Sequence, residues 1–206
     1  MVKVKICGIT SARDGRTAAR LGADALGFNF VPSSPRCVTK ERARAILAAL
    51  PPLVTPVGVF ADQEVELVRE ICAFCGIQTV QLHGSESPAY LSRLPHLKRI
   101  KALRVRVQGD LRLLSRYTCE AYLLDAFVPD QLGGTGKTFN WEWVRGSRAD
   151  GPVILSGGLT PENVGDAVRI ARPYAVDVAS GVESEPGKKD RALVAEFIVR
   201  AKRLSA

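Results

Sequence analysis

Short apolar runs recur along the chain, separated by segments in which apolar residues are spaced three or four positions apart. The runs have the length and β-branched content of buried strands, and the spaced pattern is typical of amphipathic helices. In the segment 39–50, for example, Ala43, Ile46, Leu47 and Leu50 share one helical face. The pattern predicts strands at residues 2–6, 25–30, 57–60, 79–82, 99–103, 121–124, 153–155 and 175–178.

Residues that can cap a helix precede several of the helical patterns. A side-chain oxygen at this position accepts a hydrogen bond from a free N–H group of the first turn. Ser11, Thr39, Asp62, Ser87 and Thr160 are therefore predicted to begin helices, the last two with proline at the first helical position. Further helices are expected near residues 111–117, 141–145 and 189–204.

Strands and helices thus alternate eight times within 206 residues. Such alternation predicts a parallel sheet covered by helices, which closes as a (β/α)8 TIM barrel or stays open as a doubly wound sheet. Small-residue loops follow the last two strands, and this pairing favours the barrel. We expect one α/β domain spanning residues 1–206, with no linker.

Those two loops are predicted to bind a phosphate. Ser156, Gly157 and Gly158 follow one strand, and Ala179, Ser180 and Gly181 follow the next. Glycine lets a ligand approach backbone N–H groups closely, and a helix N-terminus after the loop adds a favourable dipole.

Four side chains with useful chemistry stand at or after other strand ends. In a barrel these ends share one face, so Cys7, Arg36, His83 and Asp125 are expected to meet there. Each also has a plainer interpretation: a packed thiol, a surface arginine, a hydrogen-bonded wall residue and a solvated carboxylate. As a base, Cys7 must be a thiolate, so its pKa is expected to fall; as an acid, Asp125 must be protonated.

The composition narrows the class of protein and the partners to expect. Hydrophobic residues make up 46% and charged residues 24%, as in globular proteins. No apolar run approaches membrane-spanning length and no signal-peptide pattern begins the chain, so a cytoplasmic location and no membrane partner are expected. The net charge is +8, but basic residues are scattered and aromatics are 6%, which favours an anionic small substrate over nucleic acid.

The five cysteines do not indicate a disulfide framework, because their number is odd. Cys72 and Cys75 form a C-x-x-C pair on the apolar side of an expected helix, without a second pair or a nearby histidine. Core packing is favoured over a redox or metal site, and no metal is expected.

The segment 133–138 ends like a nucleotide-binding P-loop, but Gln131 occupies the position of the first glycine. The long segment 126–138 is interpreted instead as a lid that closes over substrate.

Six segments of the chain, in order, resemble the phosphoribosylanthranilate isomerase family of tryptophan biosynthesis. They are residues 5–10 (KICGIT), 81–84 (QLHG), 124–125 (LD), 133–136 (GGTG), 155–159 (LSGGL) and 177–183 (DVASGVE).

The resemblance implies an Amadori rearrangement of N-(5'-phosphoribosyl)anthranilate without metal or cofactor. It implies that Asp125 opens the ribose ring as an acid and that Cys7 then removes a proton as a base. It further implies that Arg36 contacts the anthranilate carboxylate, that His83 and Asp177 bind the substrate, and that both small-residue loops bind its phosphate.

Two other classes stay open. One is another sugar-phosphate isomerase or epimerase on the same barrel; an enzyme that also serves histidine synthesis would be expected to use paired aspartates, where Cys7 ends the first strand here. The other is a non-catalytic anion-binding module, prompted by the charge. The oligomeric state is expected to be a monomer or a homodimer.

Overall fold

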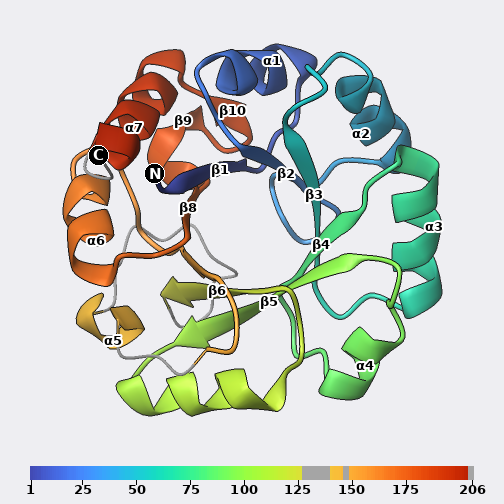
Figure 1. Ribbon diagram of the computed structural model, residues 1–206. Coiled ribbons are helices and arrows are strands. Elements are labelled where there is room, and N and C mark those ends of the chain that lie inside the picture. Colours follow the sequence, from blue (N-terminus) through green and yellow to red (C-terminus); the bar gives the residue numbers. More distant parts are fainter. Residues whose placement is uncertain (127–139, 146–148, 204–206) are drawn as a thin grey trace.

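The computed structural model describes residues 1–126, 140–145 and 149–203. Eight parallel strands close into a barrel, and helices surround it as an outer ring (Figure 1). The closure is made by the first strand pairing with the eighth. The strands are β1 Lys3–Cys7, β2 Ala25–Asn29, β3 Thr55–Phe60, β4 Thr79–Leu82, β5 Lys98–Val105, β6 Ala121–Ala126, β7 Val153–Leu155 and β8 Ala175–Val178. The predicted (β/α)8 barrel is confirmed, and the open sheet is excluded.

Helical segments connect the strands. They are α1 Ala12–Arg20, α2 Lys40–Leu47, α3 Val65–Cys75, α4 Pro88–Ser92, the 3-10 helix η1 Gln108–Arg116, α5 Glu142–Arg145, α6 Val164–Ala171 and α7 Arg191–Arg203. A short 3-10 turn, η2 Ser180–Val182, and a small hairpin, β9 Glu183–Glu185 with β10 Lys188–Lys189, lie between β8 and α7. The expected strands and helices are therefore present, whereas this hairpin was not predicted.

Successive side chains along each strand point to opposite faces of the sheet, so the hydrophobic core has two parts. On β6, Tyr122 and Leu124 belong to the layer that packs against the helices, and Ala121 and Leu123 belong to a smaller cluster on the other strand face. Residues from β3, β5, β7 and β8 complete that smaller cluster, which fills the barrel interior. Polar side chains at the carboxyl ends of the strands lie above this apolar plug.

Three of the five predicted helix caps are confirmed. The Ser11, Thr39 and Ser87 side chains each accept a hydrogen bond from a backbone N–H in the first turn that follows. Asp62 is wrong as a cap: its carboxylate accepts from Ser85 N at 2.7 Å, and α3 begins after Glu64 without a side-chain cap.

Thr160 does not cap α6 either, because the helix begins only at Val164. The Asn163 side chain accepts from Thr160 N at 2.8 Å and donates to Gly158 O at 2.9 Å. These two bonds fold residues 158–163 into a turn, so the helix N-terminus lies further from the glycine pair than the sequence predicted.

Two other expectations need correction. The segment expected as a helix near 111–117 is the 3-10 helix η1. Pro56 lies inside β3, where it pairs with Leu26, although the strand was expected to begin after it. The pairing of β3 with β4 starts only at Val57, so the missing N–H of Pro56 breaks no bond on that side.

Cys72 and Cys75 are free thiols buried on the inner side of α3, which confirms their interpretation as core residues. Burial raises the pKa of Cys72 to about 12. A thiol held in this protonated state is a poor nucleophile.

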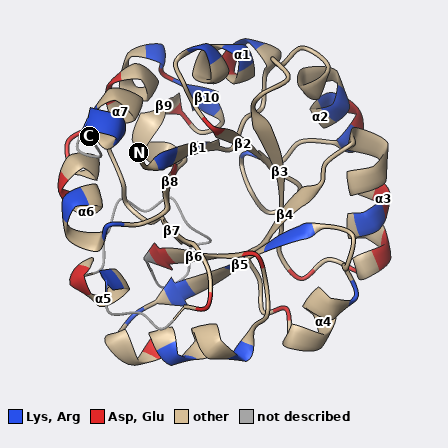
Figure 2. Cartoon of the chain, in the orientation of Figure 1, with Lys and Arg blue, Asp and Glu red and all other residues tan. Residues whose placement is uncertain are grey.

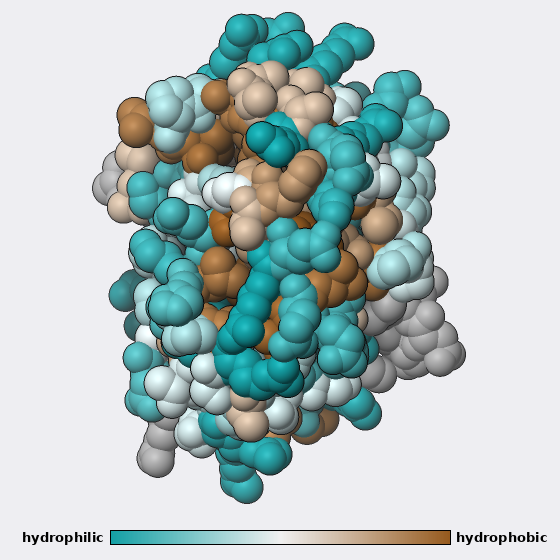
Figure 3. All heavy atoms as spheres, turned by 90° about the vertical axis from the view of Figure 1, so that its right-hand side faces the viewer, coloured by the Kyte–Doolittle hydropathy of each residue, from teal (hydrophilic) through white to brown (hydrophobic). Residues whose placement is uncertain are grey.

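Charged side chains are distributed around the outer helices, with Lys and Arg interspersed among Asp and Glu (Figure 2). On the side that carries α3, hydrophilic atoms surround smaller apolar patches (Figure 3). Phe74 of α3 is one exposed aromatic there, and the guanidinium carbon of Arg44 lies 4.8 Å from its ring centroid. Within the described residues, no helix combines the length and the apolar character needed to cross a membrane.

Candidate active site

A polar cavity lies at the carboxyl ends of the strands. Ten of the residues predicted to form the site line it, and only Gly181 is absent from its wall. The lining residues are Cys7, Asn29, Ser34, Arg36, Val59, Gln81, His83, Asp125, Ser156, Gly157, Gly158, Leu159, Asp177, Val178, Ala179 and Ser180. The expectation that residues far apart in sequence meet at this face is therefore confirmed.

Cys7 ends β1, and its thiol is nearly buried. Gly27 on β2 lies beside it so closely that a Cβ at position 27 would come within 2.6 Å of the sulfur. Burial raises the pKa of Cys7, and the nearby Lys5 ammonium only partly offsets this. The predicted fall in the Cys7 pKa is therefore wrong for the ligand-free site, because desolvation outweighs the attraction of the cation.

Lys5 and Asp177 form a buried ion pair beside Cys7. They are register partners on β1 and β8, and Lys5 Nζ donates to Asp177 Oδ1 at 2.7 Å. The Ser156 hydroxyl donates to the other carboxylate oxygen at 3.2 Å. Burial is the largest single effect and lowers the pKa of Lys5, but the combined attraction of Asp177 and Cys7 outweighs it and the net pKa is raised. One signal for Lys5 is present in the sequence, because a charged residue stands between the apolar Val4 and Ile6 of the first strand.

Asp125 ends a hydrogen-bonded chain of three side chains. Its Oδ2 lies 3.2 Å from His83 Nε2, and His83 Nδ1 lies 2.9 Å from Gln81 Nε2. If the Gln81 amide donates to Nδ1, the His83 proton is on Nε2 and donates to Asp125. Gln81 Oε1 is buried and has no hydrogen-bond partner among the described residues. Sequence reasoning missed Gln81, although it immediately precedes the Leu82–His83 strand end.

The two glycine loops lie against each other. Gly157 and Gly158 have φ values of 85° and 65°, a left-handed conformation that glycine adopts without strain. Gly181, in η2, is so near the first loop that a Cβ would lie 2.0 Å from Leu159 O. Gly181 thus joins the loops rather than lining the cavity.

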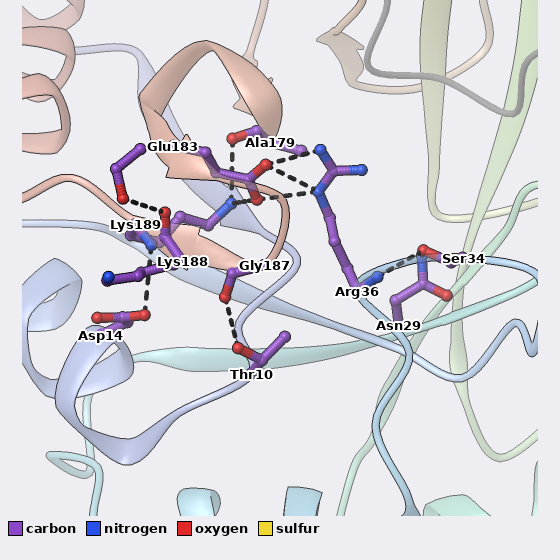
Figure 4. A network of polar contacts seen from close by, with 11 residues as sticks. Thr10, Asp14, Asn29, Ser34, Arg36, Ala179, Glu183, Gly187, Lys188 and Lys189 are labelled. Carbon is purple, nitrogen blue, oxygen red and sulfur yellow. Dashed lines mark hydrogen bonds and ion pairs between the residues drawn. The ribbon is translucent and has the colours of Figure 1, made fainter.

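Arg36 lies at the rim, in the loop after β2. Ser34 Oγ accepts hydrogen bonds from Arg36 N and from Asn29 Nδ2 and so orders this loop. The Arg36 guanidinium binds the Glu183 carboxylate, with Nη2 2.7 Å from Oε2 and Nε 2.9 Å from Oε1 (Figure 4). Lys189 Nζ contacts the same carboxylate at 2.7 Å. Glu183 ends the 177–183 segment quoted above, but neither Glu183 nor Lys189 was assigned a role from the sequence.

Segment 127–139, which includes the glycine-rich stretch and most of the expected lid, lies outside the described residues. Among the residues that are described, no group of three or more His, Cys, Asp or Glu side chains is arranged to hold a metal ion.

The closed parallel barrel and the polar cavity at the carboxyl ends of its strands define a (β/α)8-barrel enzyme. Comparison with known proteins then identifies the family. Residues 4–200 match the family described as N-(5'-phosphoribosyl)anthranilate isomerase, and the chain belongs to this family. The resemblance drawn from the six sequence segments is thereby confirmed.

Curated relatives with the same family name are similar to this chain over nearly their full length. The chain is 51% identical to the N-(5'-phosphoribosyl)anthranilate isomerase of Geobacter metallireducens, covering 98% of this chain and 100% of the relative. It is 47% identical to the enzyme of the same name from Chlorobaculum parvum, covering 96% and 94% of the two chains.

Solved structures of the same family are also similar to this chain. The chain superimposes on phosphoribosyl anthranilate isomerase from Thermotoga maritima with a TM-score of 0.92 and 42% identity, covering 98% and 99% of the two chains. A second structure, at TM-score 0.87, 39% identity and the same coverage, is a complex of such an isomerase with reduced 1-(o-carboxyphenylamino)-1-deoxyribulose 5-phosphate.

Proposed function

We propose that this chain isomerises N-(5'-phosphoribosyl)anthranilate to 1-(2-carboxyphenylamino)-1-deoxyribulose 5-phosphate, as a step of tryptophan biosynthesis. The observation that carries the proposal is the meeting of Cys7 and Asp125 in one cavity, with Arg36 and the glycine loops in the same wall. An acid and a base on opposite sides of one sugar are what an aldose-to-ketose rearrangement requires.

In the proposed first step, Asp125 acts as the general acid. It protonates the ribose ring oxygen while the bond from C1′ to that oxygen breaks, and the anilino nitrogen supplies the electron pair that forms a C1′=N iminium. Asp125 is 4% exposed, and the His83 contact orients the carboxyl group. His83 is proposed to keep the acid aligned with the sugar.

In the second step, the Cys7 thiolate acts as the general base. It removes the proton from C2′, and the released electron pair forms a C1′=C2′ bond and neutralises the iminium nitrogen. The resulting enolamine tautomerises to the ketone. Lys5 supports this role because its ammonium lowers the pKa of the neighbouring thiol against the larger effect of burial. Asp177, held by Lys5 and Ser156, is proposed to face the sugar.

Binding is proposed to use both ends of the substrate. The phosphate is assigned to the backbone N–H groups of the two loops, which comprise Ser156, Gly157 and Gly158 after β7 and Ala179, Ser180 and Gly181 after β8. The anthranilate carboxylate is assigned to Arg36. No metal or cofactor takes part in these steps.

The test compares Cys7→Ala and Asp125→Asn with the unaltered enzyme, following anthranilate fluorescence with freshly generated substrate. Loss of a general acid or base is expected to lower kcat by about 10²- to 10⁴-fold. Cys37→Ala is the matched control, because Cys37 is an exposed thiol outside the cavity. Unimpaired turnover in either site variant defeats the assigned mechanism, and inactivity of the unaltered enzyme defeats the proposed function.

Three expectations about partners and place stay predictions: a cytoplasmic location, no nucleic-acid partner, and a monomeric or homodimeric state. A solved structure of the Thermotoga maritima enzyme, 39% identical to this chain, is described as monomers generated from the dimeric isomerase, so both states are known in that relative.

A further inference from the structure

Arg36 is already engaged by a carboxylate of its own chain. Glu183 binds it side-on, using Nε and Nη2, and the Glu183 side chain is only 3% exposed. This engagement needs explaining, because the proposed function assigns Arg36 to the carboxylate of the substrate. A neutral Arg–Glu pair attracts a second carboxylate weakly, since the two charges cancel at a short distance.

Lys189 adds a second positive charge to the neutral Arg36–Glu183 pair. Its Nζ lies 2.7 Å from Glu183 Oε1, and its side chain is 3% exposed. Arg36 and Lys189 each carry one positive charge and Glu183 one negative charge, so the cluster has a net charge of +1. Lys189 therefore neutralises Glu183 and leaves the charge of Arg36 available.

Arg36 also has N–H donors that Glu183 does not use. A guanidinium offers two bidentate edges, a side edge formed by Nε and one Nη, and an end edge formed by both Nη atoms. Glu183 occupies the side edge, and Arg36 Nη1 has no partner among the described residues (Figure 4). Because Arg36 lines the cavity, a substrate carboxylate can bind end-on while Glu183 stays in place.

Lys189 Nζ makes a second contact, with the loop that follows β8. Its Nζ donates to Ala179 O at 3.0 Å, in the loop assigned to the phosphate. The described peptide bonds include no cis bond, so the N–H of Ser180 points in the opposite direction from that carbonyl, away from Lys189. One ammonium group thus orients both a loop peptide and, through Glu183, the Arg36 guanidinium.

The hairpin of β9 and β10 holds Lys189 in this position. The backbone N–H of Lys189 donates to Asp14 Oδ2, at the start of α1, at 3.3 Å. The Thr10 hydroxyl donates to Gly187 O at 2.5 Å (Figure 4). The neighbouring Lys188 points elsewhere: it pairs with Glu185, and both of those side chains are more than 60% exposed. The two adjacent lysines therefore provide a matched comparison of a buried and an exposed position.

We propose that Lys189 and Glu183 are positioning residues for substrate binding: Glu183 fixes the side edge of Arg36, and Lys189 neutralises Glu183 so that the end edge of Arg36 binds the anthranilate carboxylate. This inference rests on the proposed function and adds to it the mode of carboxylate recognition. Neither residue contacts the reacting atoms, so their loss affects binding more than the chemical step.

The experiment measures KM and kcat for N-(5'-phosphoribosyl)anthranilate in Lys189→Met, Lys188→Met and the double variant Lys189→Met/Glu183→Gln. Lys189→Met leaves a neutral Arg36–Glu183 pair, and KM is expected to rise by about 10- to 100-fold, the equivalent of one charge-assisted hydrogen bond. The kcat value is expected to fall less, and Lys188→Met is expected to match the unaltered enzyme.

The double variant separates this electrostatic role from a structural one. Glu183→Gln removes the negative charge, so Arg36 regains a net charge of +1 and KM is expected to recover by at least about threefold relative to Lys189→Met. Dissociation constants for the reduced product analogue, measured by calorimetry, should follow the same order. A structural role predicts that the second substitution worsens binding or leaves it unchanged, and that result overturns the inference.

A KM for Lys189→Met equal to that of Lys188→Met overturns it as well, while leaving the proposed function intact. Inactivity of the unaltered enzyme overturns both.

Discussion

Gly181 and Leu159 pack so closely that a Cβ at position 181 would lie 2.0 Å from the Leu159 carbonyl oxygen. The two residues belong to the loops that follow β8 and β7, so this contact sets the distance between the halves of the proposed phosphate site. Any side chain at position 181 has to push the loops apart, because the obstacle is backbone and not a flexible side chain.

Gly181→Ala is therefore expected to raise KM for the phosphorylated substrate by about tenfold or more and to destabilise the fold by roughly 1–3 kcal/mol, the usual cost of overpacking. Gly109→Ala is the control, because a Cβ there meets only a Val107 methyl group at 3.9 Å. Steady-state kinetics and denaturant unfolding measure the two effects. Equal KM values in the two variants would show that the loop spacing does not matter for binding.

The raised pKa of Cys7 makes a prediction about pH. A base must be deprotonated, so kcat/KM is expected to rise with pH and to reach half its plateau above the ordinary thiol value of about 8.5. The midpoint lies above the ordinary thiol pKa because burial disfavours the charged thiolate in the free enzyme. A kcat/KM profile that is already flat at pH 7 contradicts the assignment of Cys7 as the base in this state.

Lys5→Met is expected to move the same midpoint to still higher pH. The substitution removes the cation that lowers the Cys7 pKa and leaves the Asp177 carboxylate, which raises it. Lys3→Met is the control, because Lys3 lies on the same strand with a side chain that is 54% exposed. A shift of similar size in both variants would assign the effect to net charge and not to the buried pair.

The barrel could be predicted because its signals are local. Strands such as Val153–Leu155 are short apolar runs, and residues that end parallel strands must meet at one face whatever the details of packing. This is why Cys7, His83, Asp125 and the glycine loops were assigned to one cavity from sequence alone.

The ion pairs could not be predicted, because they depend on register and closure. Lys5 and Asp177 are 172 residues apart and become neighbours only because β1 pairs with β8 in one particular alignment. Arg36 and Glu183 are 147 residues apart, and the hairpin that brings Glu183 to the rim is too short and polar to give a strand signal. Asp62 failed as a cap for a related reason: a distant loop, at Ser85, competes for its carboxylate.

A second buried ion pair supports the loop that carries His83. Lys101 Nζ donates to Glu86 Oε2 at 2.6 Å and to Gly84 O at 2.8 Å, and both charged side chains are 1% exposed. Glu86 in turn accepts from Asp62 N and from Gly84 N. The Lys101–Glu86 pair therefore holds the turn that follows β4 through hydrogen bonds to its backbone N–H and C=O groups.

Lys101→Met leaves the Glu86 charge buried without its cation, and the expected loss of stability is about 3–5 kcal/mol. Arg169→Ala removes the exposed pair with Asp166, whose side chains are 65% and 64% exposed, and is expected to cost less than about 1 kcal/mol. Urea unfolding of both variants gives the comparison. Because the loop positions His83, Lys101→Met is also expected to lower kcat at a temperature where the variant is still folded. If Lys101→Met unfolds at the same urea concentration as Arg169→Ala, the buried pair does not hold the loop in the way its contacts indicate.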